Sequence, residues 1–244
     1  MSRISEKVNK TRLEKHLNEL AQIGTEKEGL RTRLPYTKAE REAVNLVQRY
    51  MEEAGLKTYY DQFGNLFGRL DGLDVDAPVV MTGSHVDTVI YGGAFDGAVG
   101  TLGAIEAIQV IKENNLSHNH TLEVGVFVSE EPVRFGAGTL GSKAVVGDFT
   151  IEDLDRLRDI EGITLAQALR QWGFDPVQLE TVKRDPATLK CFIELHIEQS
   201  VVLENKKIPI GVVDKIAAPT NLRLTIKGRA GHAGATPMDL RRDA

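Results

Sequence analysis

PVVMTGSHVDT (residues 78–88) and TLEVGVFVSEE (residues 121–131) are the two stretches that decide the fold. Each is an apolar run of strand length that ends in polar residues, and a helical pattern from Gly97 to about Glu113 separates them. A strand, a helix and a second strand in this order indicate a βαβ unit with parallel strands. Functional groups in such sheets gather beyond the carboxyl ends of the strands, where both polar clusters lie.

Further helices are predicted before and after this unit. An amphipathic helix follows Asn9 and stops at Gly24. Thr37 and Glu40 have the spacing of a capping box, so a second helix begins there, and Gly55 ends it. Residues 151–172 are also helical in pattern.

Further strands complete the predicted sheet. LKTYYDQF and NLFGRL, joined through Gly64 and Asn65, predict a β-hairpin, and TLKCFIELHIEQ (residues 188–199) predicts another strand. We therefore expect an α/β fold with a mixed, mostly parallel sheet covered by helices over residues 1–213.

The pattern changes after residue 213. NLRLTIKG (residues 221–228) alternates as a half-exposed antiparallel strand would, with Leu222, Leu224 and Ile226 on one face. Thr236 followed by Pro237 predicts a helix start. A strand and one helix start cannot bury a core, so residues 214–244 are expected to be the beginning of a smaller α+β domain that continues beyond this sequence.

Composition narrows the range of partners. The chain has 244 residues, 41% hydrophobic and 27% charged, which is typical of a globular protein. Its net charge of −5 disfavours nucleic acid and anionic lipid as partners, and we expect no membrane span. Cys191 is the single cysteine, which favours a cytoplasmic location over an oxidising compartment.

Four polar clusters carry candidate chemistry. GSHVDTVIYGGAFDG holds His85, Asp87 and Asp96, whose imidazole and carboxylate groups suit divalent metals, although they could also be solvated loop groups. Glu130 and Glu131 are adjacent, so one can bind a metal while the other acts as a general base. The alternative is a surface pair that forms a salt bridge with Arg134.

The other two clusters are weaker when taken alone. Within ELHIEQ, strand alternation would place Glu194, His196 and Glu198 on one face, which could equally be an exposed edge strand with a chance histidine. His232 lies between glycines in GRAGHAGATPM, where a histidine can approach a ligand or simply occupy a turn.

Taken together and in order, GSHVDTV, FDG, SEE, ELHIEQ and GHAGATPM resemble the M20-type amidohydrolases. The likeness is greatest to the N-carbamoyl-L-amino-acid hydrolase and allantoate amidohydrolase branch, and TRLPYTKAEREAVNLVQRYMEEAGL and DQFGNLFGRLDG extend it over nearly the whole chain. The resemblance implies a zinc-exopeptidase-like catalytic domain, a lid or dimerisation domain, and a homodimer. The histidine of ELHIEQ argues against the aminoacylases and dipeptidases of the family, which have an acidic ligand there.

The resemblance also implies roles for individual residues. His85 and His196 would bind one metal ion, Glu131 a second, and Asp96 both. Glu130 would be the general base and His232 would stabilise the oxyanion, typically from the partner subunit. Asp87 would orient His85, and Gln199 would contact the substrate or a ligand.

The implied reaction is hydrolysis of a linear ureido or carbamoyl amide by two divalent ions, zinc or manganese, with cobalt and nickel also compatible. The products would be ammonia and carbon dioxide. Two alternatives stay open: a non-catalytic fragment or dimerising remnant, and an aminoacylase or dipeptidase. Pro132 and Ser200 replace glycines usual in the family, and the family's last metal-binding histidine and its substrate-holding arginine and asparagine would lie beyond Ala244.

Overall fold

The computed structural model describes residues 4–26, 29–217, 222 and 224–244. The chain divides into two compact units, Met1–Ile197 and Glu198–Ala244, and each is described by itself. The domain boundary near residue 214 stays a prediction.

A five-stranded mixed sheet organises the first unit. Its strands are β1 (Lys57–Tyr60), β2 (Leu66–Leu70), β3 (Val79–Ser84), β4 (Leu122–Val126) and β5 (Leu189–Ile193), in the order β1-β2-β4-β3-β5. β3 runs parallel to both β4 and β5, while β2 is antiparallel to β1 and β4. The predicted hairpin, the βαβ unit and the mixed α/β class are therefore confirmed.

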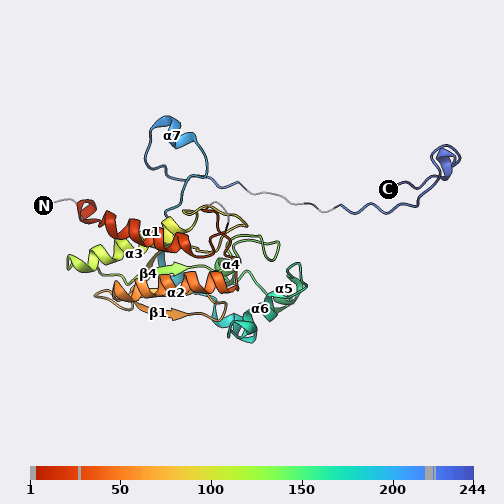
Figure 1. Ribbon diagram of the computed structural model, residues 1–244. Helices are drawn as coiled ribbons and strands as arrows, with labels where there is room; N and C mark the ends of the chain where they lie inside the picture. The colour runs from red at the N-terminus through yellow and green to blue at the C-terminus, as the bar shows by residue number, and fades with distance from the viewer. Residues whose placement is uncertain (1–3, 27–28, 218–221, 223) are drawn as a thin grey trace. The chain divides into compact units, whose positions relative to one another are not determined.

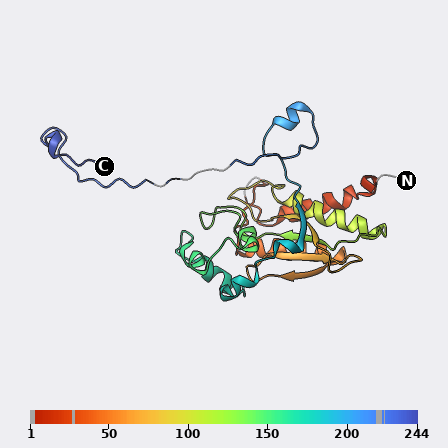
Figure 2. The same cartoon turned by 180° about the vertical axis from the view of Figure 1, so that it is seen from behind.

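Three long helices pack on one face of this sheet. They are α1 (Lys10–Gln22), α2 (Lys38–Glu53) and α3 (Ala98–Glu113) (Figure 1). The Asn9 side chain accepts a hydrogen bond from the backbone N–H of Arg12, and Thr37 accepts one from Glu40, so both predicted helix starts are confirmed. Leu20, Met51, Leu102 and other buried apolar residues of the three helices share one core with the sheet. Figure 2 shows the opposite face, with the strands in front of the helices.

Three short helices lie beyond one end of the sheet. They are α4 (Leu140–Val146), α5 (Ile151–Arg156) and α6 (Leu165–Gln171), and capping boxes at Thr150 and Thr164 start the last two. These helices surround a second core that includes Phe63, Leu140 and Leu169. The 3₁₀ turns of this unit are Ile4–Lys7, Pro176–Thr181 and Pro186–Thr188.

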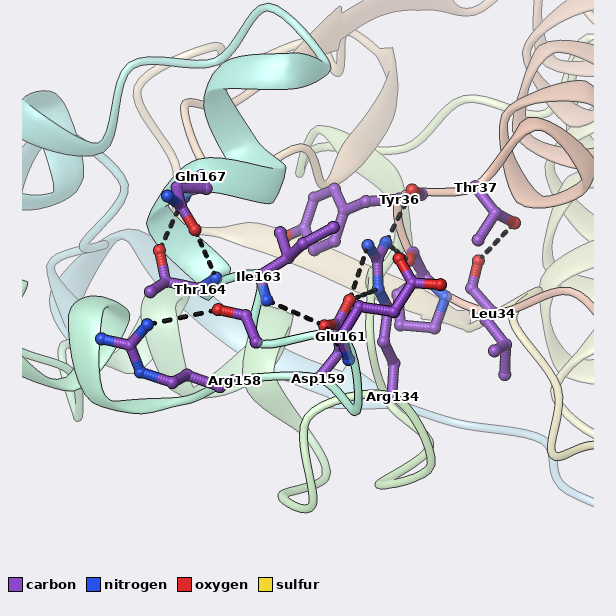
Figure 3. A network of polar contacts seen from close by, with 12 residues as sticks. Leu34, Tyr36, Thr37, Arg134, Arg158, Asp159, Glu161, Ile163, Thr164 and Gln167 are labelled. Carbon is purple, nitrogen blue, oxygen red and sulfur yellow. Dashed lines mark hydrogen bonds and ion pairs between the residues drawn. The ribbon is translucent and has the colours of Figure 1, made fainter.

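A partly buried arginine, Arg134, joins this second core to the start of α2 (Figure 3). Arg134 donates hydrogen bonds to the carbonyls of Pro35 and Tyr36, at 2.6 and 2.7 Å, and forms an ion pair with Asp159 at 3.1 Å. The alternative in which Arg134 forms a surface salt bridge with Glu130 and Glu131 is therefore wrong: its guanidinium is used elsewhere.

The ELHIEQ segment differs from its prediction. β5 ends at Ile193, so Glu194, His196 and Glu198 do not alternate along a strand. Glu198 instead accepts hydrogen bonds from the backbone N–H groups of Val202 and Leu203 at the start of α7 (Val202–Lys206). The carboxylate is thus committed to a helix start in the second unit.

The remainder of the second unit also differs from the sequence prediction. Leu222, Leu224 and Ile226 are exposed and lie in no strand of the described chain, while Asn221 and Arg223 fall outside the described residues. A strand needs a neighbour to satisfy its backbone groups, and the described part of this unit shows only a bridge between Arg229 and Arg242. The predicted helix start at Thr236 is a single 3₁₀ turn, Met238–Leu240, flanked by Pro237. Across the described residues, no helix combines the length and apolarity that crossing a membrane requires.

Candidate metal centre

The parallel strands place the candidate residues at one edge of the sheet. His85 follows the last residue of β3, Glu130 and Glu131 lie beyond the end of β4, and His196 lies beyond β5. Because these three strands are parallel, their carboxyl ends meet at the same edge. Side chains up to 111 positions apart in sequence are brought together in this way.

His85 is buried and held on several sides. Its Nδ1 lies 3.0 Å from the backbone oxygen of Asp87, which directs Nε2 toward Glu130, 3.6 Å from Oε2. Thr101 on α3 donates a hydrogen bond to the His85 carbonyl at 3.1 Å. The ring orientation is therefore set by neighbours that are themselves fixed.

His196 repeats the arrangement of His85. Its Nδ1 lies 2.8 Å from the Ile197 carbonyl oxygen, and its Nε2 lies 3.2 Å from Asp96 Oδ1. The His85 and His196 rings have centroids 6.3 Å apart. A histidine that binds a metal through one nitrogen commonly donates its other N–H to a carbonyl, and both rings fit that pattern.

Asp87 connects the loop after β3 to the loop after β4. Its carboxylate accepts hydrogen bonds from the backbone N–H groups of Glu130, at 3.3 Å, and Glu131, at 3.0 Å. The distance from Asp87 Oδ1 to His85 Nδ1 is longer, 3.5 Å. Ser129, with φ of +56°, turns the chain just before this contact. The structure thus gives Asp87 a task that the sequence did not suggest, fixing the backbone beneath the paired glutamates.

Burial and neighbouring charges shift the pKa values of the site residues. Burial raises the pKa of Glu131 to about 7, with nearby carboxylates adding to burial and His85 opposing it. Burial likewise raises the pKa of Glu130. Burial lowers the pKa of His85, but the hydrogen bond and charge of Asp87, with the charge of Glu130, outweigh it and raise the value to about 9. A divalent cation would offset the same repulsion between carboxylates.

The donor groups suit such a cation. Ligand atoms of His85, Asp96 and His196 lie within 4.8 Å of one another, and so do those of His85, Glu130 and Glu131. Zinc bonds to imidazole and carboxylate are about 2.0–2.2 Å long, so ligand atoms around one ion stand roughly 3–4 Å apart. A small movement of the His85, Asp96 and His196 side chains toward one another would therefore accommodate one ion.

Gln199 and His232, the two remaining predicted site residues, belong to the second unit, which is described by itself. There, His232 Nδ1 accepts hydrogen bonds from the backbone N–H groups of Gly234 and Ala235, both at 3.1 Å.

Pro132 begins a turn in the loop that follows the paired glutamates. Its carbonyl accepts a hydrogen bond from the Gly136 N–H, so the turn uses the carbonyl of Pro132 and not the backbone N–H that proline lacks.

Several contacts that support the site could not be predicted from the sequence. Ser84 donates a hydrogen bond to Glu194 at 2.6 Å, which fixes the start of ELHIEQ against the end of β3. Thr101 is distinguished in the sequence only as a polar residue in an apolar helix. Gly97, whose backbone lies against the His85 ring, is distinguished only as the glycine of FDG. No sequence signal marked Arg33, which is fully buried and contacts the loop after His85.

Comparison with known proteins agrees with this fold and site. Residues 70–241 match the model of peptidase family M20/M25/M40, and the chain belongs to that family. Its place within the family is the carbamoylase branch. An N-carbamoyl-L-amino acid amidohydrolase of Geobacillus stearothermophilus is 47% identical over 232 residues, 95% of this chain and 56% of the relative.

Two other relatives extend the comparison. A ureidoglycolate hydrolase of Arabidopsis thaliana is 38% identical over 95% of this chain and 50% of its own length. The crystal structure of a hydantoinase/carbamoylase family amidase from Burkholderia ambifaria superposes with a TM-score of 0.77 at 32% identity, covering 96% of this chain and 56% of that one. The chain thus spans about half the length of the relatives it matches.

Proposed function

We propose that the protein hydrolyses a linear ureido or carbamoyl amide, an N-carbamoyl-L-amino acid or allantoate, with the help of two divalent metal ions. The observation that carries the proposal is the position of His85 between two groups of potential ligands, Asp96 with His196 and Glu130 with Glu131. The similarity to an N-carbamoyl-L-amino acid amidohydrolase supports the substrate class.

In this proposal, His85 and His196 would hold one ion and Glu131 the other, and Asp96 would serve both. Zinc or manganese suits these donors, and cobalt or nickel is compatible. When bound, the ions would lower the pKa of a water and polarise the substrate carbonyl.

Glu130 is proposed to move the proton. Its pKa is raised by burial, so the carboxylate can accept a proton from water and hold it for the leaving nitrogen. Water adds to the carbonyl carbon, the C–N bond to the amino acid nitrogen breaks, and the proton passes to that nitrogen. The released carbamate decomposes to ammonia and carbon dioxide. His232, from a partner subunit of a homodimer, would donate to the oxyanion.

Two substitutions test these roles. Glu130→Gln should retain bound metal but lose turnover by about 10²-fold or more, because the proton acceptor is gone. Glu131→Gln should lower the metal content itself. Metal content by mass spectrometry and ammonia release from N-carbamoyl-L-amino acids and allantoate measure both effects. Full turnover by metal-loaded Glu130→Gln would defeat the assignment.

The alternatives have distinct products. An aminoacylase or dipeptidase would release a carboxylic acid or an amino acid without ammonia, and a non-catalytic remnant would bind fewer than two ions tightly and release no ammonia. The histidine at position 196, beside Asp96, favours the carbamoylase reaction over the first alternative.

A further inference from the structure

Arg33 is a charged residue with no exposed surface, and it lies in a segment that contacts the loop after His85. Its Nε donates a hydrogen bond to the Val86 carbonyl at 2.7 Å. Val86 separates His85 from Asp87. The bond therefore fixes the peptide between the candidate metal ligand and the carboxylate that accepts the backbone N–H groups of Glu130 and Glu131.

The backbone of the same segment adds further contacts to the loop. The Arg33 N–H donates to Thr88 Oγ1 at 2.9 Å, and the Thr88 N–H donates to the Arg33 carbonyl at 3.0 Å. Arg31 pairs with Gly92 through two backbone hydrogen bonds. Residues 31–33 and 86–92 are therefore held together at several points.

The other end of the guanidinium reaches the end of α1. Arg33 Nη1 lies 3.4 Å from the Leu20 carbonyl oxygen and 3.2 Å from that of Ile23. The Leu20 carbonyl also accepts the Ile23 N–H at 3.2 Å. The C-terminus of a helix carries partial negative charge, which favours a cation. The guanidinium thus connects the end of α1 to the peptide that follows His85.

Burying this charge is costly. Within the described residues, no carboxylate lies at ion-pair distance from Arg33, and Nη2 has no hydrogen-bond partner. An unpaired buried charge lowers the stability of the fold, so we expect a function that explains why an arginine is present at this position. A lysine at this position could not reach the three carbonyls with the geometry of a guanidinium.

We propose that Arg33 is a positioning residue for the metal centre, holding the Val86 peptide so that His85 and Asp87 keep the orientation that metal binding requires. The inference rests on the proposed metal function of His85. Residues that orient metal ligands typically change metal affinity by about 10–100-fold when substituted.

Arg31 provides a matched control. It is also buried, and its guanidinium also serves the end of α1, donating to the Ala21 carbonyl at 3.0 Å. Its side chain also donates to the Gly29 carbonyl, and within the described part of the chain it does not bond to Val86. Arg31→Lys should therefore weaken the same helix terminus without disturbing the peptide after His85.

The experiment compares Arg33→Lys, Arg31→Lys and the unsubstituted full chain. Metal-free protein is titrated with Zn²⁺ or Mn²⁺ by calorimetry, and unfolding midpoints are measured in parallel. We expect both variants to lose stability, but only Arg33→Lys to bind the metal about 10-fold or more weakly. Hydrogen exchange of residues 85–92 in the metal-free protein should also be faster in Arg33→Lys than in Arg31→Lys.

The outcomes separate the two proposals. If the unsubstituted chain binds no metal, the proposed function fails. If it binds metal and Arg33→Lys binds within about threefold of it, the positioning role is overturned. Should Arg33→Lys not fold, Thr88→Val removes the hydroxyl that accepts the Arg33 N–H, and unchanged metal affinity in that variant would count against the proposal.

Discussion

The backbone of Gly97 lies directly against the imidazole of His85. A β-carbon at Gly97 would come within 2.6 Å of His85 Nε2, and the residue has φ of +62°, which side-chain-bearing residues rarely adopt. Gly97 immediately precedes α3, so the close approach fixes the distance between that helix and the candidate metal ligand.

Gly97→Ala should therefore weaken metal binding as well as stability. The backbone conformation alone, φ of +62° with ψ of −39°, costs a residue with a β-carbon about 1–3 kcal/mol, and the contact with His85 adds to this cost by displacing the ring. Gly136→Ala is the matched control, since Gly136 has φ of +69° but no atom within 4 Å of the added β-carbon. Denaturation and zinc titration should show the larger loss in Gly97→Ala. Equal losses in the two variants would contradict the proposed contact.

Asp87→Asn should weaken the connection between the loop after β3 and the loop after β4. An amide has one acceptor oxygen and presents N–H groups to the backbone donors of Glu130 and Glu131, so one buried N–H loses its partner. We expect a loss of about 1–3 kcal/mol in stability. Metal affinity should fall about 10–100-fold, measured by calorimetry.

Asp159→Asn supplies the comparison for this substitution. The Asp159 side chain is only 8% exposed, and it also accepts backbone hydrogen bonds, from Glu161 at 3.0 Å and Ile163 at 2.9 Å. Its loss should lower stability while metal affinity stays within about threefold of the unsubstituted chain. A comparable fall in affinity for both variants would show that general destabilisation, rather than Asp87 itself, is responsible.

Glu40 should make stability depend on pH. Burial, reinforced by the charge of Asp87, raises the pKa of Glu40 to about 8, whereas an unfolded glutamate titrates near 4.3. Between these values the folded state holds a proton that the unfolded state has lost. The stabilising contribution of the proton is therefore full below about pH 4.3 and declines as pH rises to about 8.

Glu40→Gln removes this titration while keeping an acceptor for the Tyr36 N–H, which Glu40 binds at 3.1 Å. The free energy of unfolding of the variant should rise relative to the unsubstituted chain by a few kcal/mol, at about 1.4 kcal/mol per pH unit, between pH 5 and pH 8. Urea denaturation at several pH values measures the difference. Parallel pH profiles would show that Glu40 does not titrate in this range.

Arg134 and Asp159 should be strongly coupled, because their side chains are only 11% and 8% exposed. Removing one partner of a buried ion pair costs about 3–5 kcal/mol, since the other charge stays buried. Arg134→Met and Asp159→Asn together should cost less than the sum of the single substitutions, by about 1–3 kcal/mol in a double-mutant cycle. Additive losses would mean that the two side chains contribute independently, mainly through their backbone hydrogen bonds.

Local chemistry determined much of this protein from sequence alone. The caps at Asn9 and Thr37, the apolar periodicity of the long helices and the short apolar runs predicted the elements of the first unit, because capping and burial act over a few neighbouring residues. The order of motifs placed His85, Glu130 and Glu131 at strand ends, where parallel strands converge, whereas His196 was predicted to lie within a strand that in fact ends at Ile193.

Tertiary structure alone decided which side chains meet and how they are held. Arg33 bonds to Val86, and Asp87 accepts the backbone N–H groups of Glu130 and Glu131. Gly97 approaches the ring of His85. These residues are distant in the sequence, or no recognisable motif marks their contact. The same limit explains why Leu222, Leu224 and Ile226 lie in no strand of the described chain, since alternation favours a strand only when a neighbouring strand is available to pair with it.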